Sequence, residues 1–578
     1  MKSAIRIALP LALLLCAATA AAQHPQTAPA ASGEAAAPGE ALYQERCAVC
    51  HDHPKERIPP RLLLSIRSPN SVARALTRGT MRPMAEGLSA DDIAALATFL
   101  TGRVPGTEPV PVANHCTQPG APVTVGAHDW PVIGRDVGGS RFQPEPGLRA
   151  EDLSRLKLKW AFAYPEGAAG PVQIAGGRVF LASGNGWVHS LDVRSGCSYW
   201  SVDTGRTARA VTVATLAADQ NSAVRTAVFF GDDQGVVTAL DATSGAQLWK
   251  TQVETHPLAR ITAPPSVYEG RVFVPVSGME DPLTHDPSYA CCTHRGSVAA
   301  LDAASGKLLW KSYTVEEEPK PLPKTSAEDP QYFGPAGGSV FTPLGIDTRR
   351  KLVYAATAEA YGPENPPGAY SVIAFDMETG VHRWQRQFMP AEKDRARICH
   401  EAGESDCRNM FSMSTQVMVH ALADGKEVVL AGSKWGWMYA LDLATGKPRW
   451  QIESEAALCS WQAGEPAACT DVNTCSCSSA KVAATTAIPG AVFAGGWDGH
   501  VRAYATADGR LLWDVDTAVP VPAVNGVQAQ GGQVGGNPVV VSGGAVYITS
   551  GASVMGRPGN ALLVFAVEGE DAVASEPR

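Results

Sequence analysis

Two cysteines and a histidine near the N-terminus indicate the most specific chemistry in this chain. Cys47, Cys50 and His51 form a Cys-x-x-Cys-His string, the arrangement to which a c-type haem is covalently attached. The two thiols would bind the porphyrin, and the His51 imidazole would be one axial ligand of the iron. The string therefore predicts a site that accepts and donates single electrons. The alternative is a disulfide between the two cysteines beside a surface histidine.

The second axial ligand is expected downstream of the string. Met81 and Met84 both lie in the stretch "TRGTMRPMAEG", and a methionine ligand raises the potential of a haem and favours electron transfer. We predict Met81, although the sequence leaves Met84 open. A helix is predicted to follow, because Ser89 and Asp92 can form a capping box. Residues 40–103 are therefore expected to form a small α-helical cytochrome c domain.

The N-terminus has the pattern of an export signal. Lys2 and Arg6 precede an apolar run too short to span a bilayer, and alanines before Gln23 offer a small-residue cleavage site. Residues 1–22 are predicted to be a secretory signal peptide, followed by an unstructured leader over residues 23–39. Because covalent attachment of haem requires export, the signal supports the haem motif and predicts a periplasmic protein.

The charge balance excludes one class of partner. The formal net charge is −9, and it becomes about −11 without the two basic residues of the signal peptide. A chain this acidic is not expected to bind nucleic acid. No later stretch has eighteen uninterrupted apolar residues, so no transmembrane segment is predicted in the mature chain.

The remaining cysteines are predicted to form disulfides. The chain has 13 cysteines, of which Cys16 lies in the signal peptide and two lie in the haem string, which leaves an even number in an exported chain. Long loops are expected to be linked by Cys399 with Cys407 and by the cluster of Cys459, Cys469, Cys475 and Cys477. A metal site at Cys475 and Cys477 is the alternative, but no histidine or second Cys-x-x-Cys supports it.

A repeated unit occupies most of the chain after a proline-rich linker, residues 104–125. Each of six units has a β-branched strand, a glycine turn, an alternating strand that mostly ends in Leu-Asp, and a strand that ends in tryptophan. The closing residues are Trp200, Trp249, Trp310, Trp384, Trp450 and Trp513. Short strands repeated at this period are typical of a β-propeller, and we expect the tryptophans to pack between blades.

A seventh unit near the C-terminus lacks the closing tryptophan. A strand that contains Trp160 precedes the first unit, and its pairing with the last unit would close the ring and remove exposed strand edges. The predicted fold is therefore mainly β: a propeller of seven visible units over residues 126–570, preceded by the small helical domain. Residues 571–578 are expected to be a C-terminal tail.

The repeat domain resembles the dehydrogenases that use pyrroloquinoline quinone (PQQ). With its N-terminal cytochrome domain the chain is most similar to quinohaemoproteins of the polyvinyl-alcohol dehydrogenase type. The resemblance covers residues 40–570 and rests on "GRDVGGSRFQP" (134–144), the tryptophan-ending units and residues 260–310. It implies that PQQ and a calcium ion lie on the propeller axis and that an alcohol, polymeric or secondary, gives a hydride to PQQ. Electrons would leave singly through the haem to a soluble or membrane-bound acceptor.

The resemblance also implies a calcium site. Glu280 in "SGMED" matches a calcium-binding carboxylate, and Glu359 in "TAE" stands where the family has a calcium-binding asparagine. Carboxylate oxygens are the hard ligands that calcium requires. A solvated loop acid is the alternative for Glu280, because loop carboxylates are usually exposed.

Four further residues match positions that contact PQQ. Cys291 and Cys292 match an adjacent pair that, in related quinoproteins, forms a ring disulfide against the cofactor. Phe341 stands where the family usually has a tryptophan as stacking platform. Lys434 in "AGSKWG" matches a cation that faces the quinone oxygens, where positive charge would stabilise the reduced form.

Two departures from the family concern the chemistry. The segment that supplies the family's catalytic base reads "CRNMFSMST" here, with Met410 about where the base should be, while Asp406 and Glu404 lie upstream and do not match the motif. The family has eight blades, and the unit expected after Trp450 is reduced to a cysteine-rich loop. The catalytic base is therefore not identified. The alternative function is a non-catalytic propeller with a tethered cytochrome, which would serve in binding or electron transfer.

Overall fold

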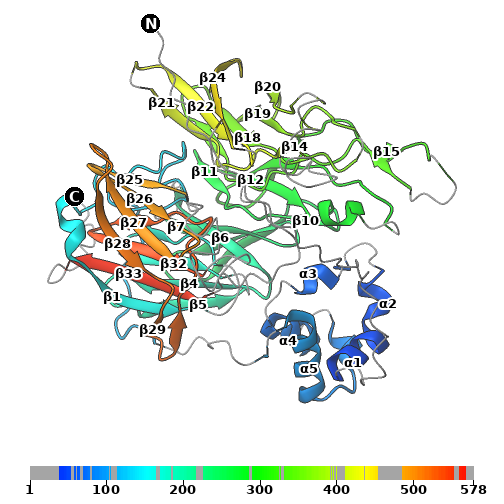
Figure 1. Ribbon diagram of the computed structural model, residues 1–578, viewed down its shortest axis with the longest axis horizontal. Coiled ribbons are helices and arrows are strands. Elements are labelled where there is room, and N and C mark those ends of the chain that lie inside the picture. The colour runs from blue at the N-terminus through cyan, green and yellow to red at the C-terminus, as the bar shows by residue number, and fades with distance from the viewer. Residues whose placement is uncertain are drawn as a thin grey trace, which may run out of the picture.

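The computed structural model contains a helical domain and a propeller (Figure 1). It describes residues 38–567 with the exception of residues 54–57, 60, 66–68, 78–80, 103, 106–113, 165–168, 184–185, 217–224, 286–288, 325, 327–330, 363, 391, 393–394, 396–398, 400–410, 423, 435, 454–483 and 552–558. The predicted signal peptide, most of the leader and the four-cysteine cluster lie outside the described residues. The same holds for Glu404, Asp406 and Met410.

The N-terminal domain is helical, as the sequence predicts. Its elements are α1 (Pro38–Arg46), α2 (Ala48–His51), α3 (Arg61–Ser65), α4 (Pro69–Thr77), η1 (Arg82–Ala85) and α5 (Ala90–Thr101). The capping box is present: Ser89 Oγ accepts a hydrogen bond from the Asp92 amide at 3.1 Å, and the Asp92 carboxylate accepts one from the Ser89 amide at 2.9 Å. Buried Tyr43 and Leu96 belong to the core that joins the helices. None of the helices that the structure describes is long and apolar enough to cross a membrane.

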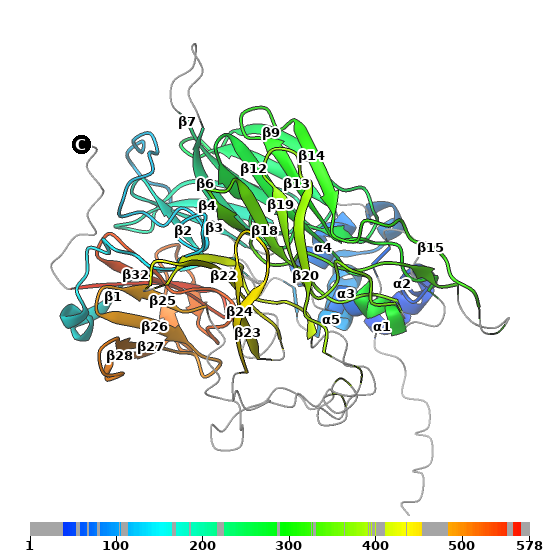
Figure 2. The same ribbon diagram turned by 90° about the horizontal axis from the view of Figure 1, so that it is seen from above.

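Seven antiparallel sheets form the propeller within the described residues, and Figures 1 and 2 show them arranged around a common axis. The first three blades contain β2 (Gln173–Ala175), β3 (Arg178–Ala182), β4 (Trp187–Asp192) and β5 (Ser198–Asp203); β6 (Ala208–Leu216), β7 (Arg225–Asp232), β8 (Val236–Asp241) and β9 (Gln247–Gln252); and β10 (Ala259–Arg260), β11 (Ser266–Tyr268), β12 (Arg271–Gly278), β13 (Ser297–Asp302) and β14 (Leu308–Tyr313).

The next three blades follow the same order of strands. They contain β17 (Gly345–Asp347), β18 (Leu352–Ala356), β19 (Ser371–Asp376) and β20 (His382–Gln387); β21 (Met418–Ala421), β22 (Glu427–Gly432), β23 (Trp437–Asp442) and β24 (Pro448–Glu453); and β25 (Thr486–Ile488), β26 (Ala491–Gly495), β27 (His500–Ala505) and β28 (Leu511–Asp516). Short additional elements are β15 (Lys320–Pro321), β16 (Phe333–Gly334), β29 (Pro520–Pro522), β30 (Gln528–Gln530), η2 (Ala150–Arg155) and η3 (Asp281–His285).

The last blade confirms the predicted closure of the ring. It contains β31 (Val540–Ser542), β32 (Ala545–Ser550), β33 (Ala561–Val567) and β1 (Leu156–Ala163). The first strand of the domain, β1, pairs antiparallel with the last, β33, from Leu156 opposite Val567 to Ala163 opposite Ala561. This pairing joins the two ends of the propeller, and it leaves no free edge on the last described strand.

The tryptophans link neighbouring blades. In five cases the indole Nε1 donates a hydrogen bond of 2.8–3.1 Å to a carbonyl of the next blade: Trp160 to Val193, Trp200 to Ala242, Trp249 to Ala303, Trp310 to Met377 and Trp384 to Leu443. Each of these rings packs against a turn glycine of that next blade. A side chain in place of Gly306 would clash, because its Cβ atom would lie 2.6 Å from the Trp249 ring. Trp450 is 38% exposed, and it precedes residues 454–483, outside the described part of the chain.

The segment that contains "GRDVGGSRFQP" connects the inner strands. Backbone hydrogen bonds join residues 130–143 to first strands of five blades, at Ile174, Val213, Ile346, Val419 and Ala487. In a sixth blade, the Ser542 hydroxyl donates to the His128 carbonyl at 2.7 Å. This segment therefore ties six of the seven described blades together around the axis.

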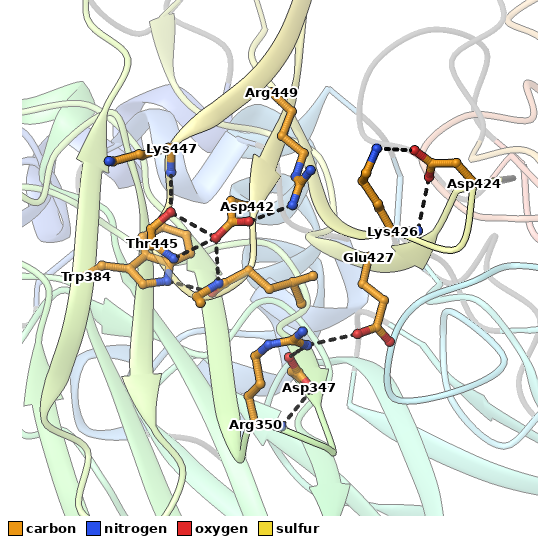
Figure 3. A network of polar contacts seen from close by, with 12 residues as sticks. Asp347, Arg350, Trp384, Asp424, Lys426, Glu427, Asp442, Thr445, Lys447 and Arg449 are labelled. Atoms are coloured by element: carbon orange, nitrogen blue, oxygen red, sulfur yellow. Dashed lines mark hydrogen bonds and ion pairs between the residues drawn. The ribbon is translucent and has the colours of Figure 1, made fainter.

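A polar network joins the fourth and fifth described blades (Figure 3). Arg350 Nη1 lies 2.9 Å from Asp347 Oδ2 within one blade and 3.0 Å from Glu427 Oε2 in the next. Replacing Arg350 with methionine leaves the buried Asp347 carboxylate without this cation, so we expect a loss of about 1–3 kcal/mol of stability. Scanning calorimetry of the purified protein measures it as a lower unfolding temperature.

Arg349 provides the matched control for this change. Its side chain is 78% exposed, and in the described part of the chain its ion-pair partner is Glu427, at 3.1 Å. Arg349→Met is expected to change stability by less than about 0.5 kcal/mol, because exposed ion pairs contribute little. Equal losses in the two variants would show that the contact of Arg350 with buried Asp347 adds no stability beyond that of an exposed ion pair.

Candidate functional site

Three predicted site residues follow the second strand of three consecutive blades. Glu280 comes two residues after β12, Glu359 three residues after β18, and Lys434 two residues after β22. Second strands run in the same direction in every blade of a propeller, so their ends lie on one face. The structure thus places Glu280, Glu359 and Lys434 on one face of the propeller, which we call the site face.

Glu280 is buried, contrary to the alternative of a solvated loop acid. Its side chain has 0% exposure, and both carboxylate oxygens accept hydrogen bonds. The Thr293 amide donates to both oxygens at 3.0 Å, the His294 amide donates to Oε2 at 2.7 Å, and the Tyr289 hydroxyl donates to Oε1 at 2.9 Å. Burial and the neighbouring Glu280 charge raise the pKa of Tyr289 above its ordinary value, so the phenol stays a donor.

Cys291 and Cys292 form a disulfide in the loop between η3 and β13. Both cysteines are buried, and they pack with Ala336 and Tyr361 and against Tyr289. Disulfides also join Cys116 to Cys197 and involve Cys399, whose expected partner Cys407 lies outside the described residues. The prediction that cysteines of this chain form disulfides is thus confirmed for these five.

Glu359 lies next to serine and tyrosine hydroxyls. The Ser412 hydroxyl donates to Glu359 Oε2, and the carboxylate is 7% exposed. Two residues later, the Tyr361 hydroxyl is 2.7 Å from Ser339 Oγ, and burial and the Glu359 charge raise its pKa far above the ordinary value. Glu359 and Ser412 therefore form a buried polar contact between the fourth and fifth blades, whereas Tyr361 contacts Ser339 and the Cys291–Cys292 pair.

Phe341 and Lys434 lie together on the site face. The Lys434 Nζ is 5.7 Å from the centre of the Phe341 ring, a cation–π distance, and the Lys434 side chain is exposed while Phe341 is half-buried. The backbone amide of Lys434 donates to the Ser412 carbonyl at 2.9 Å, which connects this pair to Glu359.

Two further polar groups at this face were missed by the sequence analysis. His294 has 0% exposure, and neither of its ring nitrogens has a hydrogen-bond partner among the described residues. Burial lowers the pKa of His294 to about 3, so the ring is neutral. The buried hydroxyl of Thr342, beside Phe341, also lacks a partner in the described part of the chain. The sequence could not identify this histidine and this threonine as site residues. Only their burial distinguishes them from other histidines and threonines, and burial depends on the tertiary structure.

The site face fits a flat, polar cofactor better than it fits a calcium ion. An exposed cation beside an aromatic ring, a buried disulfide and unpaired polar groups suit a planar anionic ligand. A calcium ion takes six to eight oxygen ligands. In the described part of the chain no three His, Cys, Asp or Glu side chains come together as a metal site, and both Glu280 oxygens already accept hydrogen bonds.

The helical domain contains the predicted haem attachment site and axial ligands. The carbonyl of Pro59 can only accept, so His51 Nδ1, at 2.7 Å from it, carries the proton and leaves Nε2 free to bind iron. Cys47 and Cys50 are free thiols on the same short helical segment. Met81 packs against the domain core, whereas Met84 is 56% exposed, which favours Met81 as the second ligand.

The helical domain contacts the propeller on the site face. Arg74 Nη1 of α4 lies 3.4 Å from the Asp203 carboxylate, and Asp203 is the last residue of β5, a fourth strand. Fourth strands end on the same face as second strands, because alternate strands of an antiparallel sheet run in the same direction. The Cys116–Cys197 disulfide attaches the linker to the start of β5.

Comparison with known proteins identifies both domains. A family model described as "Glucose/ethanol/alcohol dehydrogenase, beta-propeller domain" matches residues 130–470, and one described as "Cytochrome C oxidase, cbb3-type, subunit III" matches residues 34–100. Polyvinylalcohol dehydrogenases from Pseudomonas sp. and Sphingopyxis sp. are 34% and 33% identical to this chain. Each match covers 92% of this chain and 94% or 93% of the relative.

Solved structures share the fold at lower identity. The quinohemoprotein alcohol dehydrogenase of Comamonas testosteroni superposes with a TM-score of 0.51 and 18% identity over 77% of this chain and 81% of that one. The ADHIIG enzyme of Pseudomonas putida gives a TM-score of 0.54 and 18% identity over 78% and 82% of the two chains. These likenesses concern the propeller architecture.

Proposed function

Because this chain belongs to the PQQ-dependent quinohaemoprotein alcohol dehydrogenases of the polyvinyl-alcohol dehydrogenase type, we propose that it oxidises an alcohol at the propeller and passes the electrons to haem c. The observation that carries this proposal is 34% identity to a polyvinylalcohol dehydrogenase across 92% of the chain, through both domains. A polymeric or secondary alcohol is the substrate class that this relative's name supports. The pattern of an export signal at residues 1–22 supports a periplasmic location.

Residues of the site face would hold PQQ. The Phe341 ring would offer a flat apolar surface, the Cys291–Cys292 disulfide a second buried surface, and Lys434 a cation 5.7 Å from the centre of that ring. When bound, PQQ supplies a quinone that takes two electrons from the alcohol. The positive charge of Lys434 would stabilise negative charge on a bound cofactor and so favour its reduction.

Residues of the helical domain would hold haem c. Cys47 and Cys50 supply the thiols, His51 Nε2 one axial ligand and Met81 the other. Haem c supplies a one-electron carrier. Because α4 contacts the site face through Arg74 and Asp203, the helical domain lies on the side of the propeller where the electrons arise.

The test uses purified, haem-containing protein with added PQQ and a panel of primary, secondary and polymeric alcohols. Binding of PQQ is followed by quenching of tryptophan fluorescence, and oxidation by the absorbance of reduced haem. Quenching together with alcohol-dependent haem reduction is expected. If the folded, haem-containing protein does not bind PQQ, the proposal is overturned in favour of a propeller that binds or transfers electrons without PQQ.

The contact between Arg74 and Asp203 is expected to affect electron transfer between the domains. Both side chains are partly exposed, 27% and 36%, so the pair contributes about 0.2–1 kcal/mol to docking. Arg74→Glu introduces repulsion, and we expect haem reduction by the alcohol to slow about two- to fivefold at low ionic strength. Stopped-flow absorbance of the haem measures this rate.

The charge-swapped double variant, Arg74→Glu with Asp203→Arg, is the control for that prediction. It restores an opposite-charge pair and should recover most of the rate. PQQ binding should be the same in all three proteins, because neither residue belongs to the predicted cofactor contacts. A double variant as slow as the single one would show that this pair does not set the docking.

A further inference from the structure

Glu280 holds the loop that contains the Cys291–Cys292 disulfide. Among the described residues, its four hydrogen bonds come from residues 289–294, which precede β13, whereas Glu280 itself follows β12. The same loop is held on its other side: the Phe333 amide donates to the Cys291 carbonyl at 2.7 Å, and the Gly337 amide donates to the His294 carbonyl at 2.9 Å. Glu280 is thus one anchor of this loop, and residues 333–337 provide a second.

These donors occupy the positions that a calcium ion would need. Backbone amides approach both Glu280 oxygens at 2.7–3.0 Å, and the Tyr289 hydroxyl adds a bond to Oε1. Each donor directs the positive end of its dipole at the carboxylate, so a cation would have to displace them. Charge-assisted hydrogen bonds of this kind also stabilise a buried carboxylate in its charged form. The buried charge therefore does not require a metal ion.

His256 completes the surroundings of Glu280. Its Nδ1 accepts a hydrogen bond from the Leu258 amide at 3.2 Å, so the proton of the neutral ring is on Nε2. Nε2 lies 3.0 Å from Thr293 Oγ1 and 3.9 Å from Glu280 Oε1. The N–H group of His256 is thus within hydrogen-bond distance of Thr293 Oγ1 and close to the Glu280 carboxylate, and it offers no oxygen to a metal ion.

We infer that Glu280 is a positioning residue, which holds the Cys291–Cys292 disulfide in place for the cofactor, and that it is not a calcium ligand. This inference rests on the proposed binding of PQQ at the site face. It replaces the role that the family resemblance implies for Glu280, and it makes Tyr289 a part of the same arrangement.

Glu280→Gln is the decisive variant. Glutamine has nearly the same shape, but its amide nitrogen would face the N–H donors of Thr293 and His294, so the loop loses part of its anchor. We expect the dissociation constant for PQQ to rise about tenfold or more. After mild reduction, alkylation of Cys291 and Cys292 should be faster than in the unsubstituted protein, as mapped by mass spectrometry, with the Cys116–Cys197 pair as internal reference.

Tyr289→Phe is the matched variant with the carboxylate intact. It removes one donor and leaves the backbone donors, so PQQ binding should weaken about two- to threefold and labelling of the cysteine pair should rise slightly. For both variants, fluorescence quenching by PQQ is measured with added calcium and with a chelator. In each variant, the ratio of the dissociation constant for PQQ with chelator to that with calcium should equal the same ratio in the unsubstituted protein.

The opposite pattern overturns the inference. If Glu280 binds calcium, Glu280→Gln changes the calcium dependence of PQQ binding about tenfold, the cysteine labelling stays as before, and Tyr289→Phe has no effect on either. Absence of PQQ binding to the unsubstituted protein would instead count against the proposed function. The labelling of Cys291 and Cys292 would still show whether Glu280 holds the loop.

Discussion

A variant with alanine at both Cys47 and Cys50 is expected to contain no covalently bound haem. The two thiols are the predicted attachment points, and without them a haem would be held by the axial ligands alone and lost on denaturation. Haem staining after denaturing electrophoresis measures the covalent fraction, which should fall to background. Reduction of an acceptor that takes electrons only through the haem should fall with it.

The propeller provides the control for this double variant. The residues that we predict to contact PQQ belong to the propeller and are far along the chain from α2. Quenching of tryptophan fluorescence by PQQ should therefore persist. A small dye that accepts electrons directly from the propeller should still be reduced when alcohol is added. Covalent haem in the variant would contradict the assignment of Cys47 and Cys50.

Replacing Lys434 with methionine is expected to lower kcat for alcohol oxidation by about 10²-fold or more. Methionine keeps the length of the side chain but removes the positive charge beside Phe341, and the loss of one preorganised electrostatic contact typically costs 10²–10³ in rate. Steady-state kinetics with the alcohol identified in the panel measure the change. Lys434→Arg, which keeps the charge, should retain more activity than Lys434→Met.

Lys426→Met is the matched control for this substitution. Lys426 precedes β22 whereas Lys434 follows it, so the two lie at opposite ends of this strand. The Lys426 side chain is 60% exposed and pairs with Asp424 (Figure 3). We expect its kcat to stay within about twofold, because exposed ion pairs contribute little. Equal activity of Lys434→Met and Lys426→Met would remove Lys434 from the site.

The haem domain could be predicted from sequence because its signals are local. Cys47, Cys50 and His51 are within five positions of one another, and the capping box of Ser89 and Asp92 spans one helical turn. Short-range patterns of this kind depend on the chemistry of neighbouring side chains. They do not depend on how the rest of the chain folds.

The propeller could be predicted because its blades repeat one supersecondary unit. Strand pattern, turn glycine and closing tryptophan recur, and a unit that cannot bury its own faces must stack on copies of itself. The pairing of β1 with β33 follows from the missing strand of the last unit. Seven blades are present in the described residues, as the visible units predict.

The site could be predicted only in part, because family motifs identify residues but not their partners. Glu280 was predicted as a calcium ligand, yet its environment consists of donors 9–14 residues away in an irregular loop. No periodic pattern encodes such a loop. The His294 nitrogens have no hydrogen-bond partner among the described residues because the ring is buried, and this burial results from the packing of several blades.

By itself, the sequence determined which cofactor motif the chain carries, that its main domain is a propeller and where that ring closes. The tertiary structure alone decided that Glu280, Glu359 and Lys434 share one face and that Arg74 meets Asp203, 129 residues away, on that face. The physical reason is the separation along the chain of the residues that interact. Covalent spacing and repeat period specify local structure, whereas contacts between distant segments depend on how all blades pack around the common axis.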